Sequence, residues 1–247
     1  MGKLNKIYCI GDSHVSVFLG KDSLAPIYPA KSNSLFDFFE VVRIGPITAY
    51  NIGNANSTTR AKEKIDSLIK AEVPAGSTLI FSAGEIDIRV HLLKQATLQN
   101  KTSYEISSEI LEKYMLVLKG YANLGFNIIV LSPPPSTYIL ENLSEYPTYG
   151  TEKDRNIATK IFNENLKIQT QKNQFQLIDI FTKYIDSDYL TKQKSLWDGI
   201  HPSSYVLQDI INQLNRNLNP KLKIPVSWQL REFFRKLKSS FLTRLSR

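Results

Sequence analysis

Three residues of this chain belong to the types that together activate a serine hydroxyl: Ser13, Asp198 and His201. A serine is a poor nucleophile until a neighbouring base takes its proton. The usual base is a histidine that a carboxylate holds in the correct orientation. Asp198 and His201 are three residues apart in a turn that contains Gly199, so the carboxylate can reach the imidazole directly. We therefore predict Ser13 as nucleophile, His201 as base and Asp198 as its orienting carboxylate.

The segment around the serine, Gly11-Asp12-Ser13-His14, directly follows a short apolar run. A sharp turn from a strand into a helix would expose the hydroxyl and bring the backbone N–H of Ser13 close to a developing oxyanion. Taken alone, each motif has a simpler interpretation. A serine after Gly-Asp is often a helix cap, and Asp198 to His201 could be a surface loop before Ser203. The combination is more specific than either part.

A second group of reactive side chains occurs between Gly84 and His91, where two acids, an arginine and a histidine lie close together in the sequence. One interpretation is an internal turn closed by an ion pair between Glu85 and Arg89. The other is a polar substrate pocket, and for this we predict substrate-binding roles for His14, Glu85, Asp87 and Arg89.

The elements that must position these residues alternate along the chain. Short apolar runs rich in β-branched and aromatic residues predict strands, and apolar residues at three-to-four spacing predict helices between them. Such alternation implies parallel strands joined by right-handed crossovers. We predict an α/β fold, a three-layer α/β/α sandwich with a central five-stranded parallel sheet. The expected strands are 6–10, 39–44, 78–83, 127–132 and 175–181, and the expected helices are 58–71, 104–124, 151–171 and 203–217.

Ligands of such sheets bind beyond the carboxyl ends of the strands. The turns at Gly11, Gly45, Gly84 and Pro133 each follow a predicted strand, so all four should meet on one rim. Residues 133–150, with four prolines and three tyrosines, are predicted to form a loop over that rim and to act as a substrate lid.

A Gly-Asp-Ser after the first strand and an Asp-x-x-His before the last helix resemble the layout of the SGNH, or GDSL-like, hydrolases. The resemblance covers about residues 5–217. It implies a flavodoxin-like fold and the three catalytic roles given above, and no cofactor or metal is expected. Members of this superfamily are esterases, lipases, carbohydrate acetylesterases and some acyltransferases.

The resemblance also implies an oxyanion hole made by the N–H groups of Ser13 and of a glycine after the second strand. Gly45 is the best match, and Gly53 is the alternative. The third donor is normally the Asn of a G-x-N-D block, but here the block reads Gly84-Glu85-Ile86-Asp87. Losing one such donor costs about 2.7–4 kcal/mol. Side chains nearby that could donate instead are those of Arg89, His91, Asn51, Asn54 and Asn56.

Three functions follow as hypotheses. The first is an acyl-ester hydrolase or O-acyltransferase that acts on an O-acylated carbohydrate or polysaccharide precursor through an acyl-enzyme on Ser13. The G-E-I-D block supports the carbohydrate link, because it resembles a subset of bacterial SGNH-like proteins connected with polysaccharide biosynthesis. The second is a catalytically weak or inactive carbohydrate-binding protein, as Ile86 suggests. The third is a metal-dependent phosphoesterase built on Asp12 and His14, which a total of three histidines makes the weakest.

Charge divides the chain into two parts. Residues 1–220 carry 23 basic and 22 acidic side chains, whereas residues 221–247 carry eight basic and one acidic. We predict a hydrolase-like domain at 1–219 and, at 220–247, a linker followed by a basic amphipathic helix. Residues 227–247 could then bind an anionic membrane surface or a protein partner, or pack on their own domain. No base-reading motif accompanies them, so nucleic acid is not expected.

Composition sets the remaining expectations. The 247 residues are 42% hydrophobic and 22% charged, which suits a soluble domain with a full core. Cys9 is the one cysteine, so no disulfide can form within the chain. The first apolar run is about five residues long, too short for a secretory signal. We therefore expect a cytoplasmic protein, or one peripheral at the inner face of the membrane.

Overall fold

The computed structural model describes residues 6–139, 146–218 and 221–232. Its centre is a five-stranded sheet in which every neighbouring pair of strands is parallel, as the sequence predicts. The strands form at the short apolar runs predicted from the sequence. Their side chains are mostly apolar and can be buried on both faces of the sheet. The strands are β1 (Ile7–Gly11), β2 (Phe39–Arg43), β3 (Thr78–Ser82), β4 (Asn127–Leu131) and β5 (Gln176–Ile178).

The order of the strands across the sheet is β2-β1-β3-β4-β5, so β1 lies between β2 and β3. The chain leaves β1 towards β2 on one side and then returns to add β3 on the other. Loops after β1 and its neighbours therefore diverge, and this switch point is where open α/β sheets bind ligands. Gly11, at the end of β1, pairs with Arg43 and with Ser82. Ser13 emerges at this position.

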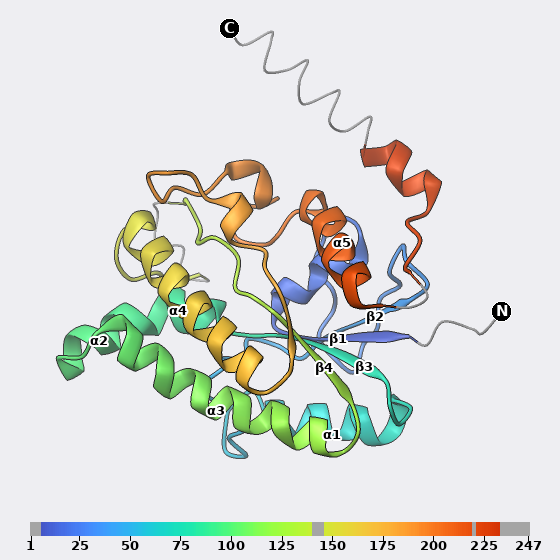
Figure 1. The fold of residues 1–247 in the computed structure, drawn as a ribbon, viewed down its shortest axis with the longest axis horizontal. Helices are drawn as coiled ribbons and strands as arrows, with labels where there is room; N and C mark the ends of the chain where they lie inside the picture. The colour runs from blue at the N-terminus through green and yellow to red at the C-terminus, as the bar shows by residue number, and fades with distance from the viewer. Residues whose placement is uncertain (1–5, 140–145, 219–220, 233–247) are drawn as a thin grey trace, which may run out of the picture.

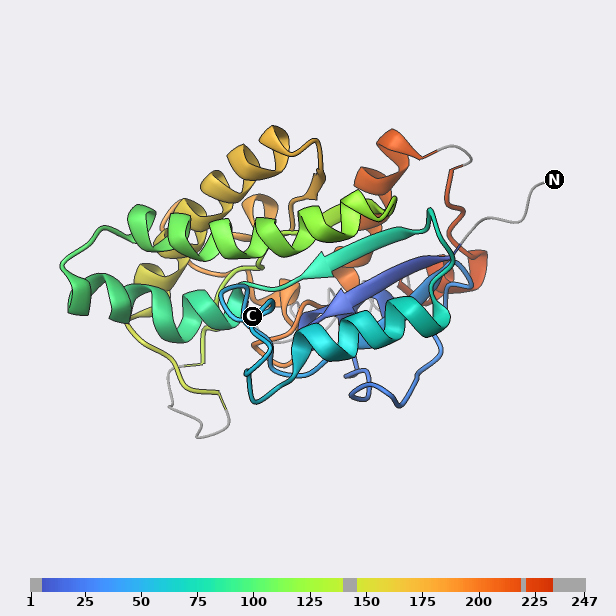
Figure 2. The ribbon, with the colours of Figure 1, turned by 90° about the horizontal axis from the view of Figure 1, so that it is seen from below.

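Helices cover both faces of the sheet, which confirms the three-layer α/β/α sandwich (Figure 1). On one face lie α1 (Ala61–Glu72) and α3 (Ser103–Asn123), as the view from below shows (Figure 2), and α4 (Glu152–Lys172) packs against α3 and joins the same core cluster. On the other face lie α5 (Leu207–Asn217) and the 3₁₀ helix η1 (Ser13–Leu19). Five further short elements are η2 (Asp87–Leu92), α2 (Leu93–Gln99), η3 (Thr182–Tyr184), η4 (Gln193–Ser195) and η5 (Ser204–Val206), the last of which leads into α5.

The polar run after β3 forms a continuous helical segment. Residues Asp87–Leu92 adopt a π-helix, η2, which passes directly into α2. Single π-turns are rare and often occur at functional sites. Because η2 begins at Asp87, its backbone sets the directions of the Asp87, Arg89 and His91 side chains.

The first part of the basic tail packs on the domain. Residues 226–232 are helical, and the side chain of Trp228 is buried against Phe36, with ring centroids 5.4 Å apart. The Trp228 indole donates to the carbonyl oxygen of Gly20, which ends η1, at 2.8 Å. The predicted amphipathic stripe lies mostly in residues 233–247, outside the described residues, and the domain boundary at 219 stays a prediction. Over the ranges that the structure describes, no helix is both long and apolar enough to cross a bilayer.

Candidate active site

The turn that carries Ser13 depends on a glycine. A methyl group at Gly11 would lie 2.2 Å from the carbonyl oxygen of Ser82, so only glycine lets β1 approach β3 this closely. The next residue, Asp12, is the N-cap of η1, and its Oδ1 accepts a hydrogen bond from the backbone N–H of His14 at 2.9 Å. Gly11 and Asp12 together place Ser13 at the first position of a helix beyond the strand end.

A second tight turn presents the histidine. Gly199 has a positive φ of +85°, and Oδ1 of Asp198 accepts from the backbone N–H groups of Ile200 and His201 at 3.0 and 2.7 Å. The carbonyl oxygen of His201 in turn accepts from the N–H of Trp197 at 3.0 Å. The turn therefore fixes the backbone of both predicted residues, and leaves the second oxygen of Asp198 free to contact the imidazole.

The structure brings Ser13, Asp198 and His201 together in the predicted order. The Asp198 Oδ2 atom lies 2.6 Å from His201 Nδ1, and His201 Nε2 lies 2.8 Å from Ser13 Oγ, across 188 residues of sequence. Burial acts to raise the pKa of Asp198, but hydrogen bonds from the side chain and backbone of His201 lower it below its ordinary value. An ionised Asp198 keeps the proton on Nδ1, so that Nε2 is free to accept the serine proton.

His14 forms a second aspartate–histidine pair beside the first. Its Nδ1 lies 3.1 Å from Asp12 Oδ1, and both side chains are almost fully buried. Burial acts to lower the pKa of His14, yet the Asp12 carboxylate and, further away, Glu85 raise it above its ordinary value. Asp12 and His14 thus bind each other. Among the described residues, no three His, Cys, Asp or Glu side chains are grouped so that they could hold a metal ion.

Glu85 and Arg89 form the internal ion pair that was one of the two interpretations of this segment. Their Oε1 and Nε atoms are 2.6 Å apart, and both side chains are only 7% exposed. Arg89 Nη1 also donates to the carbonyl oxygen of Pro147 at 2.6 Å. The pair therefore joins η2 to the loop before α4. Glu85 Oε2 is buried and has no hydrogen-bond partner among the described residues, and a substrate-binding role for the pair stays a prediction.

Asp87 ties together the loops that follow β2 and β3. Its two carboxylate oxygens accept from the backbone N–H groups of Ala49 and Tyr50, at 2.7 and 3.1 Å. Burial raises the pKa of Asp87 to about 6, in spite of those hydrogen bonds. The carboxylate also faces a cavity that is described below. Its main visible contribution is to fix the loop after β2.

The two glycines considered as oxyanion donors, Gly45 and Gly53, lie in different places. Gly45 is buried and directly follows Ile44, whose N–H donates to the carbonyl oxygen of Gly11 at 2.8 Å. Gly45 therefore lies next to the start of the nucleophile turn. Gly53 instead packs on α3, where a methyl group added to it would lie 2.6 Å from Val117. Gly45 is the better placed of the two.

At the third donor position, none of the five side chains considered from the sequence is placed by the described residues as a clear replacement. Ile86 occupies the position of the usual asparagine, and its partly exposed side chain can donate nothing. Three asparagines in the loop after β2, which sequence reasoning considered as substitutes, have exposed side chains: Asn51, Asn54 and Asn56. Of the other two, Arg89 is engaged with Glu85, and His91 lines the cavity beside Asp87.

Aromatic side chains that sequence reasoning did not assign surround His201. The Trp197 ring stacks on it with centroids 6.1 Å apart, and Tyr146 meets it edge-on at 6.0 Å. Tyr146 also lies 5.9 Å below the guanidinium of Arg89. Ile139 lies close to the turn that carries His201: a methyl group added to Gly199 would be 2.7 Å from it. Both described ends of the 133–150 loop thus lie over the site, where the lid was predicted.

Comparisons with known proteins give the fold. No protein-family model matches the sequence, and a search of curated proteins finds no match. Among solved structures, a protein of Bacteroides fragilis assigned as an acylhydrolase aligns with a TM-score of 0.54 and 14% identity, over 89% of this chain and 88% of that one. A protein of Streptococcus pneumonia assigned as a platelet activating factor aligns with a TM-score of 0.50 and 15% identity, over 87% and 84% of the two chains. The chain therefore shares the α/β fold of these two proteins.

Proposed function

We propose that the protein is a serine-dependent acyl-ester hydrolase or O-acyltransferase that acts on an O-acylated carbohydrate. One observation carries this proposal: the unbroken line of hydrogen bonds from Asp198 through His201 to Ser13, with lengths of 2.6 and 2.8 Å. Both lie within the reach that proton transfer to a general base requires. The fold shared with an acylhydrolase supports the ester class of substrate.

The chemistry follows from this geometry. Ser13 Oγ attacks the ester carbonyl carbon while its proton passes to His201 Nε2, and the carbonyl π-electrons move onto the oxygen. When the intermediate collapses, the bond to the leaving alkoxide breaks and His201 returns the proton to that oxygen, which leaves an acyl-enzyme. Water, or a sugar hydroxyl, then attacks the acyl group and gives its proton to His201. The Ser13–acyl bond breaks and Ser13 takes the proton back.

The N–H groups of Ser13 and Gly45 are the donors proposed for the oxyanion. With Ile86 at the third position, one of three customary donors is missing, which corresponds to a loss of about 10²–10³ in rate. Ile86 at this position also favours the second candidate function, a carbohydrate-binding protein of the same fold with weak or no catalysis. The intact hydrogen-bonded line from Asp198 to Ser13 favours the enzyme.

The surroundings of His201 support a carbohydrate as the alcohol part of the substrate. Trp197 is 37% exposed beside the imidazole. Rings of this kind pack on the C–H faces of sugars and keep a polar edge in water. The leaving oxygen would depart on the His201 side, because His201 must protonate it.

A labelling experiment tests the proposal. Wild-type protein should react with a fluorophosphonate probe and turn over p-nitrophenyl acetate, whereas Ser13→Ala should do neither. Ser187→Ala, at an exposed serine outside the site, is the matched control and should behave like wild type. Unlabelled wild-type protein, or turnover that Ser13→Ala leaves unchanged, would refute the enzyme reading. Adding a free sugar during turnover of the ester separates the two chemistries, because a transferase forms a sugar ester and a hydrolase does not.

A further inference from the structure

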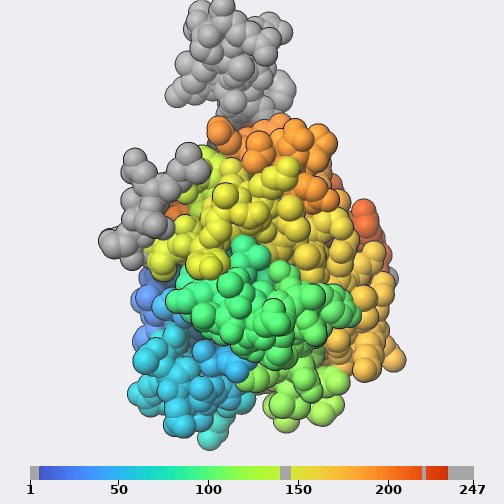
Figure 3. All heavy atoms as spheres, turned by 90° about the vertical axis from the view of Figure 1, so that its left-hand side faces the viewer, coloured from blue at the N-terminus to red at the C-terminus, as the bar shows by residue number. Residues whose placement is uncertain are grey.

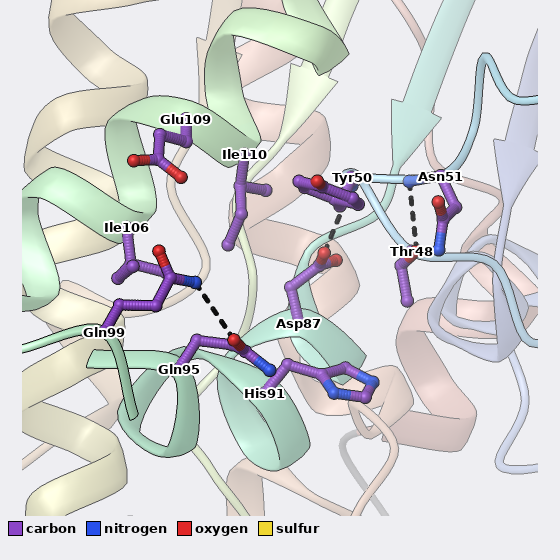
Figure 4. Close-up of a pocket in the computed structure, with 10 residues that line it drawn as sticks. All are labelled: Thr48, Tyr50, Asn51, Asp87, His91, Gln95, Gln99, Ile106, Glu109 and Ile110. Carbon is purple, nitrogen blue, oxygen red and sulfur yellow. Dashed lines mark hydrogen bonds between the residues drawn. The ribbon is translucent and has the colours of Figure 1, made fainter. Parts of the chain in front are cut away.

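A cavity of about 300 Å³ lies on the edge of the molecule where three segments meet. The loop after β2 supplies Thr48, Tyr50 and Asn51, the η2–α2 segment supplies Asp87, His91, Gln95 and Gln99, and α3 supplies Ile106, Glu109 and Ile110 (Figure 4). In the space-filling view, the blue to cyan region after β2 borders the green α2–α3 region on this face (Figure 3). Cavities of this size hold small ligands.

The walls of this cavity are held in place by the protein itself. Asp87 fixes the backbone of Ala49 and Tyr50, and Thr48 Oγ1 accepts from the N–H of Asn51 at 3.1 Å. On the opposite wall, Gln99 Nε2 donates to Gln95 Oε1 at 3.0 Å. That bond uses one donor of Gln99 and one acceptor site of Gln95, so both amides keep further hydrogen-bonding capacity. The polar groups are therefore arranged before any ligand arrives.

The charges in the cavity are largely compensated. Glu109 pairs with Lys101 at 2.6 Å, and both oxygens of Asp87 already accept from backbone N–H groups. Burial, with Lys94 and Arg89 nearby, lowers the pKa of His91, which disfavours a positive charge on its imidazole. An anion would meet two carboxylates, and a cation would find both carboxylates already engaged. A neutral ligand fits best.

The remaining lining describes the shape of that ligand. Ile106 and Ile110 form an apolar wall, and Tyr50 adds an aromatic ring that carries the Lys113 ammonium, with Nζ 3.4 Å from the ring centroid. Amide and hydroxyl groups surround this apolar strip. A pyranose ring has the matching pattern, with hydroxyls around its edge and C–H groups on its faces.

The cavity is connected with the candidate active site through the two loops that flank Ser13. Thr48 is three residues after Gly45, and Asp87 directly follows Ile86. Both loops leave strands that neighbour β1. We propose that this cavity binds a neutral sugar ring of the glycan whose O-acyl ester reacts at Ser13. This inference rests on the proposed function for its link to Ser13, while sugar binding itself does not require turnover.

Direct binding tests the cavity independently of catalysis. The probes are glucose, N-acetylglucosamine and their β-1,4-linked disaccharides, measured by titration calorimetry and saturation-transfer NMR. At least one should bind to the wild-type protein, and the double variant Gln95→Leu/Gln99→Leu should weaken that binding at least tenfold. Gln208→Leu is the matched control, because Gln208 forms an equivalent amide pair with Asn212 on α5, and it should bind like wild type.

The outcomes that would contradict the sugar site differ from those that would contradict the proposed enzyme function. If no probe binds, or if the double variant binds as well as wild type, the cavity is not a sugar site, even when Ser13 is labelled by fluorophosphonate. Tighter binding of glucose 6-phosphate than of glucose would overturn the neutral class of ligand. Binding of sugars without any labelling of Ser13 would refute the proposed enzyme but support the cavity. With an acetylated disaccharide as substrate, the double variant should lose at least tenfold in kcat/KM relative to Gln208→Leu.

Discussion

The imidazole rings of His14 and His201 lie 5.3 Å apart at an angle of 43°, and each binds its own aspartate through Nδ1. Only the second ring reaches Ser13. The first is 2% exposed, and its Nε2 has no hydrogen-bond partner among the described residues. The buried His14–Asp12 pair therefore stabilises the nucleophile turn, and His14 does not take the serine proton.

Replacing His14 by glutamine should destabilise the protein in a pH-dependent manner. The Asp12 carboxylate raises the pKa of His14 in the folded state. The resulting stabilisation is fully present below the unfolded pKa of about 6.5 and is lost as pH rises through the higher folded pKa. Urea unfolding should show a difference of about 1.5–3 kcal/mol between wild type and His14→Gln near pH 6, and a smaller one near pH 9. An equal difference at both pH values would show that the charge of His14 plays no part.

Replacing Asp198 by asparagine should remove activity and keep the fold. The asparagine Oδ1 can still accept from Ile200 and His201 N–H groups, but its NH₂ would face His201 Nδ1 and favour the wrong tautomer. We expect kcat for p-nitrophenyl acetate to fall by about 10³–10⁴, with little change in Tm. Asp186→Asn is the control, since Asp186 Oδ1 makes a similar turn with two backbone N–H groups away from the site. A kcat within tenfold of wild type would contradict the role of Asp198.

Restoring the absent oxyanion donor should increase the rate. Ile86 is partly exposed, so Ile86→Asn replaces a side chain that the core does not require. If the hole is incomplete at this position, kcat should rise at least about tenfold, as part of the 10²–10³ that one donor contributes. Ile86→Leu keeps an apolar side chain and should leave kcat close to wild type. Equal rates for the asparagine and leucine variants would mean that another group already stabilises the oxyanion.

Removing the Trp228 side chain should destabilise the domain. The indole is 5% exposed, packs on Phe36 and donates to the Gly20 carbonyl oxygen. Trp228→Ala should lower the free energy of unfolding by about 3 kcal/mol, which chemical denaturation can measure. Leu230→Ala is the matched control in the same helix, because Leu230 is 53% exposed and should change stability by less than about 0.5 kcal/mol. Similar effects of the two variants would show that the tail does not dock as described.

The strands could be predicted to within a few residues, because each short apolar run has the length and composition of a buried strand. Where a predicted boundary was wrong, a local feature of the chain decided the observed one. The last strand was predicted to reach residue 181 but ends at Ile178, since Asp179 Oδ1 accepts from the N–H groups of Phe181 and Thr182 and bends the chain. The first long helix begins at Ala61 and not at residue 58, because Arg60 has a φ of +52°.

The proximity of Ser13, Asp198 and His201 could be predicted for a different reason. Each of these residues lies in a short motif next to an element that sequence patterns identify. The cavity was not. Its lining comes from three separate segments, and Gln95 and Gln99 look like the solvated face of a helix when read in sequence. The π-helix of Asp87–Leu92 also leaves no periodic signal in six residues. Trp197 could have been noticed, since it directly precedes Asp198.

The hydrogen bond from Trp228 to Gly20 has a consequence for energetic coupling. Gly20 ends the helix that Ser13 begins, so the tail and the nucleophile segment share one docking equilibrium. By thermodynamic reciprocity, docking of Trp228 and ordering of the η1 helix stabilise each other by one and the same coupling free energy, so a ligand that rigidifies η1 strengthens the docking in return.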